Sequence, residues 1–348
     1  MTRYPSLEHL IALTDDVGVI QHATFDVPNR STGYCTDDVS RALIVAIGAA
    51  RNPELRPAAE KLALVYLAFL HDAQMPEGKF HNFMGYNRNW LADPGSEDAD
   101  GRAIWSLGYT MLHTERDGWR RMCGLLLDRA LEKFEEHYWL RGRAYGVIGL
   151  SHALTFDPNN EERRRLLKRI SERIMLAYDE RAYPEWGWFE EKMIYANARL
   201  PEALLRAGQV LNSQQMIAVG LESLRFYESI VVENGMFVPV GSQGWFPRGG
   251  ERSRYPQQPI EAAGLVDAAL VAHEITGEDH YLALADVAMD WFFGKNSHGA
   301  VLVSGGGCRD GIDEHTVNAN MGAESTISYL SAAIAIADSK IPERFRLR

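Results

Sequence analysis

The sequence has few cysteines, no strongly basic stretch and no hydrophobic run long enough to cross a bilayer. The three cysteines, Cys35, Cys123 and Cys308, are far apart in the chain, which favours reduced thiols over disulfides or a zinc cluster. Because 47 acidic residues outnumber 36 basic ones and the net charge is −11, we expect no nucleic-acid partner. The first residues also lack the apolar core of a secretory signal, so we expect a cytoplasmic protein without a membrane partner.

Signals for metal sites and for β-structure are sparse as well. The 11 histidines are scattered and no His-Glu-x-x-His or paired-cysteine pattern occurs, so no metal and no cofactor is predicted. Short β-like runs at 235–240 and 300–303 are bounded by glycine or proline, and we interpret them as small β-hairpins in loops. A composition of 46% hydrophobic and 24% charged residues is typical of a folded globular chain.

The sequence is rich in short segments that combine alanine or glycine with other apolar residues on nearly every side. A helix that is apolar all round must be buried all round. These segments therefore predict inner helices. They recur along the whole chain, at 42–50, 103–108, 146–150, 203–208, 262–266 and 327–334.

Between the inner segments lie helices with a single apolar stripe. In 53–71, for example, Leu55, Leu62 and Phe69 share one face, whereas Glu54 and Lys61 lie off it. The alternation of inner and outer helices predicts a ring that closes on itself, an all-α (α/α)6 barrel forming one domain over 1–348. The outer segments are 6–13, 53–71, 119–138, 160–178, 212–231 and 280–293.

The loops that precede the inner helices are long and rich in polar and aromatic residues, whereas return loops such as 156–159 and 207–209 are short. Long ordered loops are costly and are more often functional than not. We therefore expect the functional site at the N-terminal ends of the inner helices, which we call the mouth of the barrel.

Tryptophans beside carboxylates, amides and arginines in these loops predict a sugar as the ligand. A flat ring can stack on the C–H face of a pyranose, and the polar groups can bond its hydroxyls. Packing of the mouth is the alternative role for each aromatic. The residues that we expect to bind sugar are Asp37, Trp90, Asp100, Arg102, Tyr145, Glu185, Trp186, Trp188, Asn197, Arg199, Trp245, Arg254, Gln258, Glu261, His315, Asn318 and Asn320.

Four further acids are candidates for catalysis. Asp38 and Asp98 stand at helix starts, where an acid can also serve as a cap. Tryptophans flank Glu190 and would favour its protonated form, so we expect it to be the general acid and Asp38 or Asp98 to be the base. Glu324, in an apolar helix start, and Glu261 are the alternates. An inverting pair requires carboxyl groups about 6.5–9.5 Å apart.

The segments 33–43 (GYCTDDVSRAL) and 318–326 (NANMGAEST) resemble bacterial proteins encoded with or fused to glycosyltransferases. More broadly, the whole chain resembles the six-hairpin glycosidase superfamily. The resemblance implies an (α/α)6 barrel, a carbohydrate-active enzyme with its acids at the starts of the inner helices, and association with a glycosyltransferase as partner.

Three functions fit these patterns. The first is a glycoside hydrolase that cleaves a short oligosaccharide by carboxylate acid/base catalysis. The second is a sugar epimerase or isomerase that uses histidines as acid and base, for which His81, His152 and His315 are the candidates. The third is a glycan-binding partner of a glycosyltransferase without catalytic activity.

Overall fold

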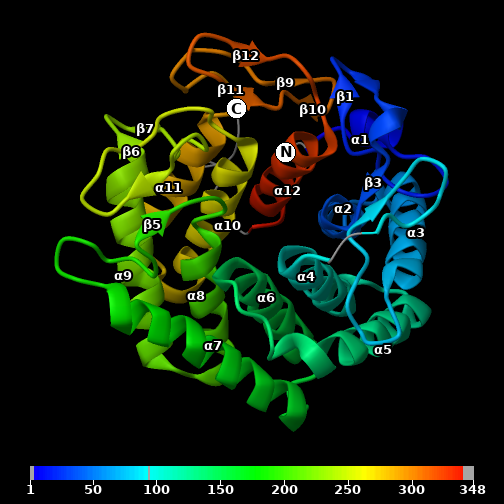
Figure 1. Ribbon diagram of the computed structural model, residues 1–348, viewed down its shortest axis with the longest axis horizontal. Helices are drawn as coiled ribbons and strands as arrows, with labels where there is room; N and C mark the ends of the chain where they lie inside the picture. Colours follow the sequence, from blue (N-terminus) through cyan, green and yellow to red (C-terminus); the bar gives the residue numbers. More distant parts are fainter. Residues whose placement is uncertain (1–3, 93–94, 340–348) are drawn as a thin grey trace.

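The computed structural model describes residues 4–92 and 95–339, in which inner and outer helices alternate along the chain (Figure 1). The inner helices are α2 (Thr36–Ala49), α4 (Glu97–His113), α6 (Leu140–Phe156), α8 (Arg199–Leu211), α10 (Pro259–Thr276) and α12 (Ala323–Asp338). The outer helices are α1 (Glu8–Leu13), α3 (Arg56–Ala73), α5 (Asp117–Phe134), α7 (Glu161–Arg181), α9 (Gln214–Val231) and α11 (Asp279–Asp290).

The inner helices form a closed ring. Each packs on the next in the order α2, α4, α6, α8, α10 and α12, and α12 packs again on α2 (Figure 1). Nearly every residue of α2 and most residues of α10 are buried, as expected for helices that are apolar on all sides. The predicted all-α (α/α)6 barrel is therefore confirmed, and the predicted inner segments lie within these helices except for Ala50, which caps α2.

Glycines allow α4 and α6 to approach very closely. Gly108 faces the carbonyl of Gly149, and Gly149 faces the backbone of Ile104 and Trp105, so a Cβ atom at either glycine would collide with the opposite helix. Backbones that approach so closely leave no space for a side chain between them. The glycines that the sequence placed in inner segments thus set the spacing of this helix pair.

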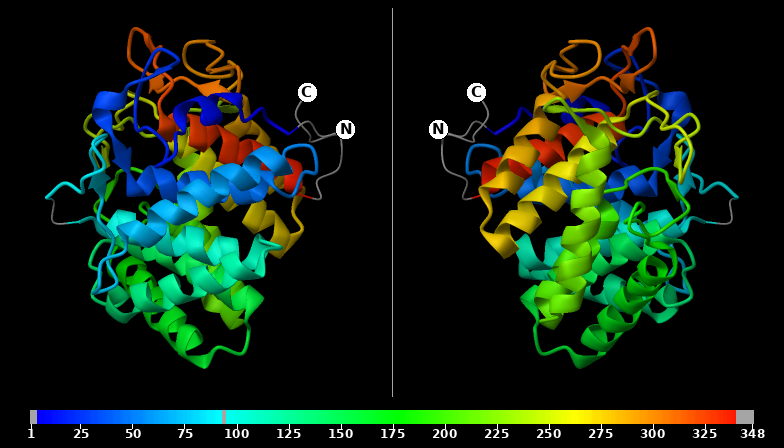
Figure 2. Two further views of the ribbon diagram at one scale, coloured as in Figure 1. Left: turned by 90° about the vertical axis from the view of Figure 1, so that its right-hand side faces the viewer. Right: turned by 90° about the vertical axis from the view of Figure 1, so that its left-hand side faces the viewer.

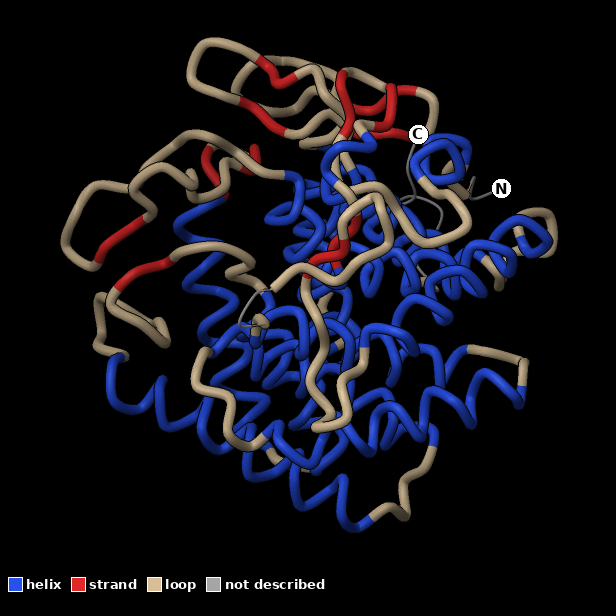
Figure 3. Tube along the Cα trace, turned by 45° about the vertical axis from the view of Figure 1, so that its right-hand side comes forward, coloured by secondary structure: helices blue, strands red, loops and turns tan. Residues whose placement is uncertain are grey.

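The loops before the inner helices carry all the strands of the described residues, each two residues long. Figures 2 and 3 show these loops gathered at one end of the helices. Both predicted hairpins are present, as β6 with β7 and as β9 with β10. The strands are β1 (Ala23–Thr24), β2 (Val27–Pro28), β3 (Tyr34–Cys35), β4 (Phe83–Met84), β5 (Lys192–Met193), β6 (Val232–Glu233), β7 (Met236–Phe237), β8 (Phe246–Pro247), β9 (Val303–Ser304), β10 (Gly307–Cys308), β11 (Gly311–Ile312) and β12 (Val317–Asn318).

Two of the strand pairs join loops that are far apart in the sequence. β3 pairs with β4 in antiparallel register, and β5 pairs with β8 in the same way. They tie the loop before α2 to the loop before α4, and the loop before α8 to the loop before α10. The mouth is therefore a connected structure. Within the described residues, no helix is both long enough and apolar enough to span a membrane.

The glycine contact between α4 and α6 predicts a large loss of stability on substitution. Gly149→Ala places a methyl group against the backbone of α4, so the helices must separate, and we expect the free energy of unfolding to fall by about 1–3 kcal/mol. Urea unfolding measures the change. Gly118→Ala in α5 is the control, because its methyl group would meet open space and should stabilise the helix by up to about 1 kcal/mol. Equal effects of the two substitutions would contradict this packing.

Candidate active site

A buried arginine joins three carboxylates at the mouth. Arg41 lies in the first turns of α2, close to Asp37 and Asp38 of the same helix. Its Nε donates to Asp37 Oδ1 at 2.8 Å, and its Nη2 donates to Asp38 Oδ1 at 2.8 Å. The same Nη2 donates to Glu324 Oε2 of α12 at 3.1 Å. Two of the predicted catalytic acids, Asp38 and Glu324, therefore share one guanidinium nitrogen.

A second arginine extends this cluster across the ring. Arg102 of α4 is also buried and forms an ion pair with Asp37. Its Nη2 donates to the Tyr145 hydroxyl of α6 at 2.8 Å, and its guanidinium lies 4.6 Å from the centre of the Tyr145 ring. Asp37, Arg102 and Tyr145, all predicted from the sequence, thus link α2, α4 and α6.

The other two catalytic candidates lie in a neighbouring cluster. The Tyr195 hydroxyl donates to Asp98 Oδ2 at 2.7 Å. Arg141 of α6 donates from Nε to the Tyr195 carbonyl at 2.9 Å and forms an ion pair with Glu190. Because Asp98 lies one turn before Arg102 on α4, the two clusters adjoin at the mouth.

Adjacent carboxyl groups in the first cluster differ in their protonation. Burial raises the pKa of Asp38 to about 7, and the negative charges of Asp37 and Glu324 act in the same direction against Arg41. Burial alone would also raise the pKa of Asp37, but Arg102 and Arg41 outweigh it and hold that pKa below its usual value. Near neutral pH, Asp38 can therefore donate a proton beside a carboxylate that stays ionised.

Asp98 is a second carboxyl group with a raised pKa. Burial is the main cause, and the charge of Arg102 and the hydrogen bond from Tyr195 oppose it. The mouth thus holds two carboxyl groups that retain protons more readily than free aspartate. It also holds carboxylates paired with arginine, such as Glu190. This arrangement can supply both an acid and a base.

Glu261 and Asn197 form a loop anchor. Glu261 is buried and accepts bonds from the backbone N–H groups of Ala196 and Asn197 and, at 3.0 Å, from the Tyr227 hydroxyl. Asn197 Nδ2 also donates to Glu261 Oε2 at 3.2 Å. Glu261, expected as a sugar contact and an alternate catalytic acid, therefore faces the loop before α8 and holds its backbone.

Arg199 and Asp100 also serve the interior. Arg199 is buried and contacts Glu202 at 2.5 Å and Asp267 at 2.8 Å. Asp100 accepts a bond from the Phe80 N–H at 2.8 Å. Both side chains are therefore occupied inside the fold. They do not serve as the sugar contacts that we expected from the sequence.

The predicted tryptophans divide into covered and partly open rings. Trp188 is fully buried, and Trp186 is only 4% exposed with its indole N–H donating to the Glu190 carbonyl at 2.7 Å. Neither offers a ring face to a sugar, so their expected stacking role is corrected to packing. Trp90 and Trp245 are half-buried, and Trp245 lies 6.3 Å from the Tyr195 ring. These two rings stay candidates for sugar stacking.

An open groove leads away from the first cluster along the loops before α10 and α12. Its inner part has a volume of about 320 Å³ and is lined by Gln258, Asn318 and Glu324, among others. Its outer part, of about 770 Å³, is lined by Arg254 and His315 among others. The structure thus places five predicted residues along one groove.

Two other predicted residues lie outside this groove. Asn320 accepts a hydrogen bond from the Phe25 N–H, and Glu185 is exposed.

Arg41, Arg141 and Tyr195 belong to the site but were not among the predicted residues. Arg41 lies four residues after Asp37 and directly before the apolar run that starts at Ala42, and a charge beside such a buried run requires a buried partner. That signal was available in the sequence. The partner of Arg141 comes from a distant loop, which no local pattern indicates.

The three histidines offered for an epimerase lie apart. His81 stacks on Trp90 at 4.9 Å near the mouth, and His315 is exposed in the loop between β11 and β12. His152 is buried on α6 near His113, and burial holds its pKa well below the usual value. The structure brings no two of these three together as an acid and base pair.

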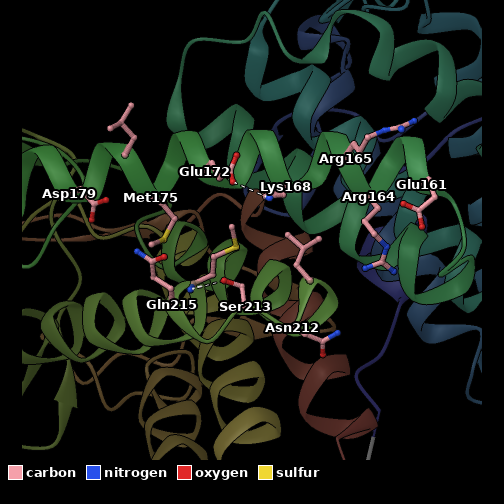
Figure 4. Close-up of a pocket in the computed structure, with 13 residues that line it drawn as sticks. Glu161, Arg164, Arg165, Lys168, Glu172, Met175, Asp179, Asn212, Ser213 and Gln215 are labelled. Carbon is pink, nitrogen blue, oxygen red and sulfur yellow. Dashed lines mark hydrogen bonds and ion pairs between the residues drawn. The ribbon is translucent and has the colours of Figure 1, made fainter.

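A wide groove of about 800 Å³ lies elsewhere, on the outer wall between α7 and α9 (Figure 4). Its walls carry both signs of charge, including the ion pair of Lys168 with Glu172 at 3.8 Å. None of the predicted site residues lines it. Because it lies away from the mouth, we do not assign it to the active site.

Among the described residues, no cluster of His, Cys, Asp and Glu is arranged to hold a metal ion.

Comparison with solved structures supports the fold. No protein-family profile and no curated protein matches the sequence. The chain is similar to a cellobiose 2-epimerase from Bacillus thermoamylovorans, at 10% identity over 96% of both chains with a TM-score of 0.73. It is also similar to a sugar epimerase from a ruminal bacterium, at 12% identity over 96% of this chain and 99% of that chain, with a TM-score of 0.71.

A hydrolase has the same architecture. The GH76 α-mannanase of Bacteroides thetaiotaomicron is 8% identical, over 94% of this chain and 92% of that chain, with a TM-score of 0.65. At such low identities, the likeness shows the (α/α)6 fold that these carbohydrate enzymes share, in agreement with the six-hairpin resemblance.

The raised pKa of Asp38 predicts a pH-dependent contribution to stability. Unfolded Asp38 loses its proton near pH 4 and the folded residue near pH 7, so its stabilising contribution is complete below pH 4 and lost by pH 7. Asp38→Asn removes this dependence. As the pH rises from 4 to 7, we expect the free energy of unfolding of the variant to increase by roughly 2–4 kcal/mol relative to that of the unaltered protein. Urea unfolding at a series of pH values measures the difference, and a difference independent of pH would refute the assignment.

Proposed function

We propose that the protein is a glycoside hydrolase that cleaves a short oligosaccharide by inverting acid/base catalysis. The observation that carries the proposal is the contrast between Asp38, with a pKa of about 7, and its neighbour Asp37, whose pKa Arg102 and Arg41 hold below its usual value. Neighbouring carboxyl groups whose environments separate their pKa values are characteristic of an acid and base pair.

Asp38 is the proposed general acid. It protonates the leaving glycosidic oxygen, while a carboxylate takes a proton from water as that water attacks the anomeric carbon. The C–O bond breaks, and exchange with solvent then restores both protonation states. From the sequence we expected Glu190 to be the acid, but in the structure its carboxylate forms an ion pair with the guanidinium of Arg141.

We propose Glu190 as the base. Asp98, which accepts a hydrogen bond from the Tyr195 hydroxyl, is the alternative base. Glu324, whose side chain is 43% exposed, is placed to bond substrate hydroxyls beside Asp38. The half-buried rings of Trp90 and Trp245 are the proposed stacking surfaces.

We also propose a cytoplasmic location, with which the burial of the three unpaired cysteines is compatible. A glycosyltransferase is the proposed partner.

Epimerisation of a sugar is the second candidate, because solved epimerases have the same fold. The separation of His81, His152 and His315 favours hydrolysis over an epimerase that would use these residues. The product discriminates the two reactions. Hydrolysis creates a new reducing end, whereas an epimerase leaves the number of reducing ends unchanged.

Amide substitutions test the assigned roles. With an oligosaccharide that the intact protein hydrolyses, Asp38→Asn and either Glu190→Gln or Asp98→Asn should lower kcat/KM at least about 100-fold. Release of reducing sugar measures the rate, and circular dichroism verifies the fold. Glu132→Gln on the outer face of α5 is the control and should leave the rate unchanged. Full activity of every mouth variant would refute the assignment.

The pH profile tests the acid separately. Because Asp38 must carry a proton to act, we expect kcat/KM to fall as the pH rises above about 7. In Asp38→Asn, the residual activity should lose this alkaline decline. A wild-type rate that stays constant to pH 9 would exclude Asp38 as the acid. Proton NMR of the first product should show the inverted anomer.

A further inference from the structure

The groove beside the catalytic cluster is larger than a single sugar ring requires. Its inner part of about 320 Å³ and its outer part of about 770 Å³ are both lined by Pro256 and Asp313, so the two parts adjoin. A typical pocket for a whole small ligand has about 300–1,000 Å³. The path begins at Glu324, which contacts Arg41 together with Asp38, and it continues outward to His315. A chain of several sugar units therefore fits along it.

The floor of the groove is held in a fixed conformation. The backbone N–H of Gln257 donates to the Ile312 carbonyl at 2.8 Å, and the N–H of Ile312 donates back to the Gln257 carbonyl at 3.0 Å. The Gln257 side chain accepts a bond from the Trp291 indole at 3.0 Å and donates to Ser297 Oγ at 2.5 Å. These bonds join the loop before α10 to β11. A preformed floor reduces the entropy lost when a ligand binds.

The charges that line the groove are predominantly negative. Besides two histidines, the charged residues of its two parts are one arginine, Arg254, and four acids. Arg254 Nη2 lies 3.0 and 2.9 Å from the two carboxylate oxygens of Glu233, which also forms an ion pair with Arg252. The four acids are Asp310, Asp313, Glu314 and Glu324.

Glu324 is paired with Arg41, but Asp310, Asp313 and Glu314 form no ion pair within the described residues, so an anionic ligand would meet repulsion where these three acids line the groove. Asp310 is partly engaged, since it accepts bonds from the Gly322 N–H at 2.8 Å and from the Ser325 hydroxyl at 2.6 Å. These donors are neutral, so the negative charge of the carboxylate persists. Hydroxyl groups, in contrast, can donate to carboxylates and accept from the amide groups of Gln258 and Asn318.

We propose that this groove binds an uncharged oligosaccharide of several sugar units and discriminates against uronates and sugar phosphates. The inference rests on the proposed function, because it takes the substrate to be a sugar chain that reaches Asp38. Beyond the proposed function, it specifies that this substrate is uncharged and several sugar units long. It also favours water over inorganic phosphate as the attacking group, since phosphate would meet the same negative surface.

Binding measured without turnover tests the proposal. The probes are cello-, malto- and manno-oligosaccharides and the same oligosaccharides oxidised to the uronate at one terminal C6. Calorimetry on the Asp38→Asn variant, with native folding verified, should show that the neutral form of the bound series has at least about tenfold higher affinity than its uronate. The difference should shrink as the salt concentration rises, because salt screens the repulsion.

Charge-neutral variants identify the source of the discrimination. Asp313→Asn combined with Glu314→Gln should reduce the difference between neutral and anionic ligands to less than about threefold. The matched control, Asp72→Asn combined with Glu132→Gln, removes two exposed charges from α3 and α5 and should leave the difference intact.

The length of the ligand is tested with the neutral oligosaccharides. Their affinity should increase with each sugar unit until the groove is filled.

Two different failures can be distinguished. Equal or tighter binding of the uronate at low salt would overturn the charge selectivity proposed here, even if the protein hydrolyses sugars through Asp38. Equal affinity for a disaccharide and for its longer homologues would overturn the multi-unit groove. Binding of no oligosaccharide in the panel by the folded protein would count against both this inference and the proposed function.

Discussion

The buried guanidinium of Arg41 is the interaction on which the mouth of the barrel depends. A charge removed from water is tolerated only with close partners of opposite sign, and here those partners come from the first and the last inner helix. Arg41 thereby joins α2 and α12 at the point where the ring closes. The same contact gathers three carboxylates around one cation. Burial raises the pKa of Asp38 to about 7, the charges of Asp37 and Glu324 act in the same direction, and Arg41 opposes them.

The close contact of α4 and α6 has a similar double consequence. Because glycines replace side chains where the two helices meet, Arg102 on one helix can reach Tyr145 on the other at 2.8 Å. Arg102 also holds Asp37 in its ionised form. The close packing of α4 on α6 thus lies beside the arginine that helps to keep Asp37 ionised, although the packing glycines themselves do not touch the carboxyl groups.

The sequence was sufficient to predict the fold and the general position of the site. Helices that are apolar all round can only be inner helices, and their alternation with one-sided helices predicts a ring. Residues near inner-helix starts, such as Asp38, Asp98 and Glu324, lie at the mouth because helix polarity fixes that end. Their arginine partners Arg41 and Arg141 depend on contacts between distant segments, so local patterns revealed them poorly.

Aromatic residues in the loops were harder to interpret from the sequence. Trp186, Trp188 and Trp245 lie in similarly aromatic loops, but the first two pack beneath neighbouring rings and the third stays half-buried. Composition indicates that a loop is aromatic, whereas exposure depends on how several loops fold over one another. Likewise, Glu261 looked like a cavity acid but anchors the backbone of a loop from another hairpin.

The central claim is that Asp38 at the mouth loses its proton only near neutral pH, whereas its neighbour Asp37 is already ionised there. A direct measurement is NMR titration of protein labelled with ¹³C at the aspartate side-chain carboxyls, with the Asp38 resonance identified by its loss in Asp38→Asn. The account predicts a midpoint near pH 7 for this resonance. A midpoint near pH 4, as for a free aspartate, would contradict it.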